Sequence, residues 1–142
     1  CGRQRLNING AIDIETLEPT TGFYDTINAD STMDLFSKIA AKHPKAQTIY
    51  IIVDNARYEH ACLLKTYLDG TKIQLIFLPP YSPNLNLIER YWKFFKKTVL
   101  HNRYYETFEE FQQACKCFFR KRKKYLPELQ SLLTERFHIQ AV

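Results

Sequence analysis

The chain has 142 residues, which suits one domain with a hydrophobic core of its own. Hydrophobic residues make up 45% and aromatic residues 14%, so disorder along the whole chain is excluded. The formal net charge of +5 suits a polyanionic partner, and no apolar stretch approaches the roughly 20 residues that a membrane span needs.

The cysteines point to no metal site. Cys1, Cys62, Cys115 and Cys117 form no pair with two residues between them, and no histidine is spaced to complete a zinc site. We expect reduced thiols in a cytoplasmic protein. No signal peptide is visible, and because the chain begins at Cys1 with strand-like sequence, we expect a piece of a longer product.

The first third of the chain predicts a hairpin and a helix. Residues 5–15 alternate between apolar and polar side chains, which indicates a half-covered strand. Residues 18–22 are typical of a turn, and residues 23–27 resume as a second, antiparallel strand. Ser31 is the expected N-cap of a helix with acidic Asp34 in its first turn, and this helix ends near residues 43–44.

The middle of the chain predicts parallel strands joined by a helix. Residues 48–53 are apolar throughout, which predicts a strand buried on both faces, and residues 73–78 predict another. Residues 58–68 form the helix between them, which ends at residues 69–70. Strands alternating with helices indicate an α/β fold, and the leading hairpin makes the sheet mixed.

The last third predicts two helices after a stiff loop. Prolines at positions 79, 80 and 83 exclude regular structure, and a helix follows over residues 86–100. Its core-facing stripe is Ile88, Tyr91, Trp92 and Phe95. Thr107 and Glu110 predict a capping box, which starts a helix with one apolar side, made of Phe108, Phe111, Cys115, Phe118 and Phe119. We expect one domain over residues 1–125 and a C-terminal tail over residues 126–142.

Asp54 and Glu89 are the candidate catalytic residues. Asp54 follows the strand over residues 48–53, where open α/β sheets place ligands, although capping of the next helix explains it equally well. Glu89 lies in the first turn of a helix, and the alternatives are dipole stabilisation and an ion pair with Lys93. The proline-stiffened loop favours a fixed ligand. Paired carboxylates suit Mg²⁺, and two such ions about 3.5–4 Å apart need three or more acidic ligands.

Basic residues surround this pair. Lys93, Lys96 and Lys97 share a helix face with Glu89 and suit a DNA backbone, although a solvated face is the commoner fate of lysine. The denser run of basic residues either binds phosphates or is a solvated helix end: Arg120, Lys121, Arg122, Lys123 and Lys124. His60 suits proton transfer or the orientation of a scissile phosphate, but a local hydrogen bond on a helix surface is the commoner role of such a histidine.

Three segments resemble one known family. They are Gly2-Arg-Gln-Arg-Leu-Asn-Ile-Asn-Gly10, Val53-Asp-Asn-Ala-Arg-Tyr-Glu-His60 and Leu78-Pro-Pro-Tyr-Ser-Pro-Asn-Leu-Asn-Leu-Ile-Glu-Arg-Tyr-Trp-Lys93. Together they resemble the catalytic domain of transposases of the IS630/Tc1/mariner superfamily, closest to the bacterial IS630 type. The last segment is the most specific, because a helix that opens with Glu and Trp after Pro-Pro-Tyr-Ser-Pro is hard to reach by chance.

The resemblance implies an RNase H-like fold with a DDE/D triad of metal ligands. Asp54 matches the second acid and Glu89 the third, with thirty-four residues between them, and Asn55 matches a supporting position beside the second acid. We expect His60 to be a supporting residue as well. The implied chemistry is DNA strand cleavage and strand transfer at transposon ends with Mg²⁺, as two ions, or with Mn²⁺ as a substitute. The implied partners are transposon-end and target DNA and a second copy of the full-length protein, in a bacterial, nucleoid-associated setting. Arg90 joins the three lysines of its helix and residues 120–124 as expected DNA contacts.

The chain departs from the family pattern in two places. Leu87 stands where members usually carry Pro. The first strand of the fold, with the first Asp, is expected upstream of Cys1, as is the DNA-binding helix-turn-helix. Asp13 and Asp25 lie in no matching motif, so we expect them to be ordinary polar residues. The alternative function is a non-catalytic DNA-binding or interaction fragment of a decayed element.

Overall fold

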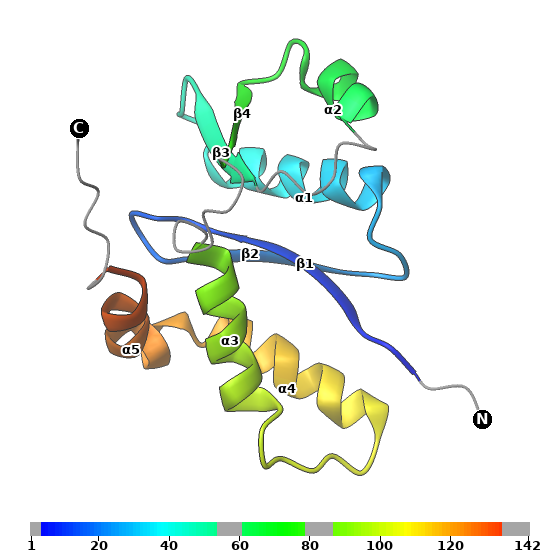
Figure 1. The fold of residues 1–142 in the computed structure, drawn as a ribbon, viewed down its shortest axis with the longest axis vertical. Coiled ribbons are helices and arrows are strands. Elements are labelled where there is room, and N and C mark those ends of the chain that lie inside the picture. The colour runs from blue at the N-terminus through cyan, green and yellow to red at the C-terminus, as the bar shows by residue number, and fades with distance from the viewer. Residues whose placement is uncertain (1–3, 54–60, 79–86, 135–142) are drawn as a thin grey trace. The chain divides into compact units, whose positions relative to one another are not determined.

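The computed structural model describes residues 4–53, 61–78 and 87–134 as a mixed α/β chain (Figure 1). The elements in order are β1 (Asn7–Ile12), β2 (Pro19–Tyr24), α1 (Ala29–Lys42), β3 (Ile49–Val53), α2 (Ala61–Leu68), β4 (Ile73–Phe77), α3 (Leu87–Val99), α4 (Phe108–Arg120) and α5 (Arg122–Thr134). The chain divides into two compact units, with α1, β3, α2 and β4 in one and α3, α4 and α5 in the other. Within the described ranges, no helix is long and apolar enough to span a membrane.

The hairpin of β1 and β2 forms, but its turn lies earlier than predicted. β1 and β2 pair in a two-stranded sheet, and their short connection requires antiparallel strands. The Asp13 carboxylate accepts hydrogen bonds from the backbone N–H groups of Glu15 (2.8 Å) and Thr16 (3.1 Å), and Leu17 takes a left-handed φ of 59°. The turn therefore closes before residue 18, and Asp13 serves the turn as an ordinary polar residue.

The expected turn at residues 18–22 is wrong, because these residues belong mostly to β2. Pro19 is the first residue of the strand, where its missing N–H is tolerated. Thr20 and Gly22 are buried. β2 ends at Tyr24, so the predicted second strand over residues 23–27 overlaps it by only two residues.

The N-cap of α1 is Asn28 rather than Ser31. The Asn28 side chain accepts from the Ser31 backbone N–H at 3.0 Å, and the Asn28 N–H donates to the Ser31 hydroxyl at 2.8 Å, which completes a capping box. Ser31 is thus the third residue of the helix, because Asn28 competes successfully for the cap. The predicted end is confirmed, since His43 is the C-cap.

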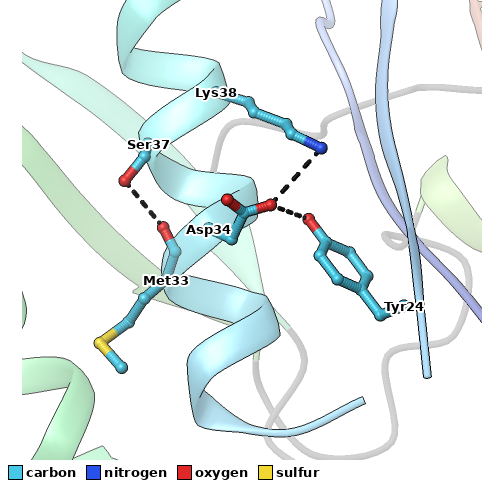
Figure 2. Close-up of polar contacts among 5 residues, drawn as sticks. All are labelled: Tyr24, Met33, Asp34, Ser37 and Lys38. Carbon is cyan, nitrogen blue, oxygen red and sulfur yellow. Dashed lines mark hydrogen bonds and ion pairs between the residues drawn. The ribbon is translucent and has the colours of Figure 1, made fainter. Parts of the chain in front are cut away.

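A polar cluster joins β2 to α1. Figure 2 shows the Asp34 carboxylate between the Tyr24 hydroxyl, which donates to it at 2.6 Å, and the Lys38 ammonium at 3.4 Å. The Lys38 ammonium also lies 5.4 Å from the centre of the Tyr24 ring. One turn on, the Ser37 hydroxyl donates to the Met33 carbonyl and hydrogen-bonds the Tyr67 hydroxyl of α2 at 2.5 Å. These contacts link three elements of one unit.

β3 and β4 are parallel neighbours, as predicted. Their register pairs Ile49 with Ile73 and Val53 with Phe77. α2 provides the crossover and ends at a turn in which Gly70 has a φ of 83°, a conformation that favours glycine. The strands are separate from the β1–β2 pair in the described residues, so the sheet is not continuous there.

The prediction that these two strands are buried on both faces is wrong for the described structure. Tyr50 is 63% exposed, and Ile52, Ile76 and Phe77 are 44–49% exposed. Ile49, Ile51 and Val53 are half-buried in alternation with these side chains. The alternation arises because successive residues of a strand point to opposite faces, and only one face is covered by other described residues.

Aromatic side chains form the core between α3 and α4. Phe95 stacks on Phe119 with ring centres 5.0 Å apart and meets Phe118 edge-on at 5.2 Å. Tyr91 is 2% exposed, and its burial raises the pKa of its hydroxyl. The predicted stripe of α3 is confirmed at Tyr91 and Phe95, and the buried set also includes Phe94 and Val99. Cys115 and Cys117 carry free thiols, and burial raises the pKa of Cys115 to about 11.

Residues 122–134 form the helix α5, where we predicted a helix end followed by a tail. The basic residues 120–124 span the end of α4, its C-cap Lys121 and the first turn of α5. Leu129 and Leu133 of α5 are each 2% exposed, so the helix is anchored in its unit. The domain boundary at residue 125 stays a prediction, although α5 runs across it.

Candidate active site

The segments that lead to the two candidate acids leave β3 and β4 at the carboxyl ends of these parallel strands. The backbone N–H of Leu78 donates to the carbonyl of Val53 at 2.9 Å, one step beyond the last ladder pair. Val53 directly precedes Asp54, and Leu78 directly precedes the proline-rich loop before α3. The carboxyl ends of parallel strands are where α/β proteins place their ligands. Asp54, Asn55 and His60 themselves lie outside the described residues, as do residues 79–86.

Glu89 lies where the sequence predicted it, in the first turn of α3. Its side chain is exposed. The positive end of a helix favours a carboxylate at this position. The alternative of an ion pair with Lys93 is not seen among the described residues, whereas Asp34 and Lys38 do form such a pair one turn apart in α1. Glu89 is therefore an exposed carboxylate without an ion pair to another described residue.

The described donor set fits a hard cation in kind but is incomplete in number. Carboxylate oxygens are the ligands that Mg²⁺ and Mn²⁺ prefer. No group of three or more Asp, Glu, His or Cys side chains gathers in the part of the chain that the structure describes. Glu89 is thus one described donor, and Asp54 is the expected second.

The basic residues of α3 face away from its buried stripe. Lys93, Lys96 and Lys97 are exposed, whereas Tyr91 and Phe95 on the other side are buried. Arg90 is half-buried, and its guanidinium donates to the Leu132 carbonyl of α5 at 3.3 Å. α3 therefore combines an acid at its start with a row of cations along the same face.

Residues 120–124 do not act as one uniform patch. Arg122 is half-buried, and its guanidinium donates to the Thr16 carbonyl in the hairpin turn. The Lys124 ammonium lies 5.5 Å from the centre of the Tyr125 ring. Arg120, Lys121 and Lys123 are exposed. The fold thus uses Arg122 to hold a turn, and the others face solvent.

Comparison with known proteins decides the family. The family model described as DDE superfamily endonuclease matches residues 2–112, which is most of the chain. The chain belongs to the DDE superfamily of endonucleases. This confirms the resemblance predicted from the sequence, to the DDE domain of IS630-type transposases.

Two curated relatives of this DDE-superfamily chain share part of its sequence. The uncharacterized 39 kDa protein of insertion element IS630 from Shigella sonnei is 31% identical over 71 residues, which are 49% of this chain and 21% of that protein. The uncharacterized protein y4pE/y4sA of Sinorhizobium fredii is 34% identical over 65 residues, 46% of each chain. The chain thus matches less than half the length of either relative.

Membership in the DDE superfamily supports a nuclease of the transposase type that uses divalent metal ions. The individual site residues stay predictions. Sequence reasoning also missed the residues that α5 brings beside α3, among them Glu128, Ser131 and Leu132. The spacing of Leu126, Leu129 and Leu133 is the helical signal that could have found them.

Proposed function

We propose that this chain is the larger part of the catalytic domain of an IS630-type DNA transposase. The domain cleaves DNA strands at the ends of its element and joins them to target DNA. The observation that carries the proposal is the DDE superfamily match over residues 2–112, which contains both acids. The hydrogen bond between Leu78 and Val53 supports it, because the two acid-bearing segments leave the sheet together.

In this proposal Asp54 and Glu89 hold divalent metal. Mg²⁺, or Mn²⁺ in its place, supplies a Lewis acid that neutralises charge on the scissile phosphate and activates the attacking oxygen. The protein contributes position rather than covalent chemistry. In sequence, Asp54 directly follows Val53, the last residue of the β3–β4 ladder, and Glu89 lies in the first turn of α3. Asn55 and His60 are supporting residues.

The remaining features are proposed from the same membership. The fold is RNase H-like. The substrate is DNA at the element ends and at the target, the working form is a homodimer of the full-length protein, and the setting is the bacterial nucleoid. The net charge of +5 supports the DNA partner, because cations along α3 reduce the cost of approaching phosphates.

The test compares single variants of the full-length protein on DNA that contains an element end. We expect Asp54→Asn and Glu89→Gln each to abolish cleavage with Mg²⁺ and with Mn²⁺, while DNA binding remains. Glu109→Gln is the matched control, because Glu109 is an exposed acid in the first turn of α4. Cleavage at wild-type rates by either acid variant would refute the assignment. A wild-type protein that binds but never cleaves would support the non-catalytic alternative.

A further inference from the structure

A groove runs between α3 and α5 within one compact unit. It is open to solvent and has a volume of about 580 Å³. α3 contributes Arg90, Lys93, Phe94 and Lys97, and α5 contributes Pro127, Glu128, Ser131 and Leu132. The size is within the range of about 300–1,000 Å³ that small-molecule sites occupy, so a short stretch of an extended ligand fits.

One wall of the groove is cationic. Lys93 and Lys97 are four residues apart, so their Cα atoms are separated by about 6 Å along the axis of α3. Each DNA strand carries one charge per about 3.4 Å of duplex axis, so the two lysines can meet different phosphates of one strand. In the described ranges neither lysine forms an ion pair. Arg90 serves the groove differently, because its bond to the Leu132 carbonyl joins the two walls.

The other wall carries apolar and polar side chains, and its apolar members are Pro127 and Leu132. Leu132 is 44% exposed, and Pro127 is exposed as well. Phe94 closes the floor and is 7% exposed. Apolar surface beside cations suits a ligand that alternates charged and uncharged parts, as phosphates and sugars do. Glu128 is the one acid among the lining residues, and its charge opposes an anionic ligand.

We propose that the groove between α3 and α5 binds the sugar-phosphate backbone of one DNA strand, with Lys93 and Lys97 on two different phosphates of that strand. The inference rests on the proposed function and deepens it, because it names which basic residues hold the DNA next to Glu89. Lys93 lies one helical turn after Glu89 on the same face, so a strand in the groove is led toward the acid. Lys96 and residues 120–124 do not line the groove.

The test measures how DNA affinity depends on salt in the full-length protein. Lys93→Gln/Lys97→Gln should make the slope of log K against log salt shallower by about 1.8 for duplex DNA, about 0.9 for each lost phosphate contact. Lys45→Gln/Lys65→Gln is the matched control, because it removes the same charge from exposed lysines outside the groove. Its slope should change by less than half as much. If the two double variants had equal slopes of log K against log salt, the proposal that the groove binds DNA would be wrong.

Two further arms separate DNA binding in the groove from a protein contact there and from a failure of the catalytic assignment. Glu128→Gln should raise DNA affinity several-fold, and an unchanged or lowered affinity would contradict the proposal. All variants are also measured in the Glu89→Gln background, where we expect no cleavage. If Glu89→Gln still cleaves but the lysine variants make the salt slope shallower, the catalytic assignment fails and the groove proposal stands. If Glu89→Gln abolishes cleavage but the lysine variants leave the slope unchanged, the groove proposal fails and the catalytic assignment stands. A changed sedimentation velocity with an unchanged slope would make the groove a protein contact and overturn it.

Discussion

The guanidinium of Arg90 donates to the backbone carbonyl of Leu132, with 3.3 Å between nitrogen and oxygen. Arg90 lies in the first turn of α3, and Leu132 is two residues before the end of α5. The last four carbonyls of a helix lack partners within it, and a cation is favoured there by the helix dipole. The contact thus fixes the start of α3, where Glu89 lies, to a helix that is distant in sequence.

Arg90→Gln should lower the free energy of unfolding by about 0.5–1 kcal/mol. The magnitude is small because the contact is exposed to solvent and water competes for both groups. Urea denaturation of the purified protein measures it, with Lys96→Gln as the control for loss of one positive charge from the same helix. A free energy of unfolding equal to that of the Lys96 variant would mean that the Arg90–Leu132 contact does not stabilise the protein.

Gly22→Ala should destabilise the unit that contains β2 and α1 by about 1–3 kcal/mol. A Cβ atom at Gly22 would overlap the ring and hydroxyl of Tyr24, two residues along the same face of β2. The ring must then move, and its hydrogen bond to Asp34 is lost. Thr21→Ala, on the other face, is the control. In a Tyr24→Ser background the same glycine change should cost much less, and an equal cost there would place the clash elsewhere.

The Tyr24–Asp34 pair should make stability depend on pH at both ends of the scale. The hydrogen bond from Tyr24, and then Lys38, hold the pKa of Asp34 below its ordinary value. The stability from Asp34 is therefore present above its unfolded pKa of about 3.9 and is lost as pH falls through the lower folded value. Burial, and then the bond to Asp34, raise the pKa of Tyr24. Its contribution is present below the ordinary value of about 10 and is lost as pH rises toward the folded value.

Urea denaturation at a series of pH values tests this pair against Tyr24→Phe. The Phe variant keeps the ring but cannot donate to Asp34 or ionise. We expect its stability to fall less than that of the wild type as pH drops below about 4 or rises above about 10. Parallel curves for the two proteins at the acid end would show that the hydrogen bond does not set the pKa of Asp34.

The sequence predicted elements whose signals are local. The sequence predicts β4 from a mostly apolar run, and it predicts the end of α1 at His43 and the start of α4 at Thr107 from residues at the helix ends. α5 was missed because Pro127 interrupts its helical pattern and a basic run precedes it. The burial of β3 was overestimated because burial depends on what covers each face, which a strand's own sequence does not contain.

The same distinction between local signals and packing applies to the candidate site. The motif around Asp54 and the loop before Glu89 identified the acids, and the superfamily match contains both. The groove was beyond sequence reasoning, because Lys97 and Leu132 meet only through the packing of α3 on α5. Likewise, the amino-acid order gives no sign that the Arg90 guanidinium contacts the Leu132 carbonyl.

Because β3 and β4 are parallel, the loops at the two ends of these strands differ in what they connect. The end at Val53 and Leu78 leads to the segments that carry both candidate acids, so under the proposed function an added or deleted residue there would shift a metal ligand. The opposite end of the strands holds the turn at Gly70, which leads from α2 into β4. The loops of relatives should therefore vary in length at the Gly70 turn and keep a constant length after Val53 and Leu78.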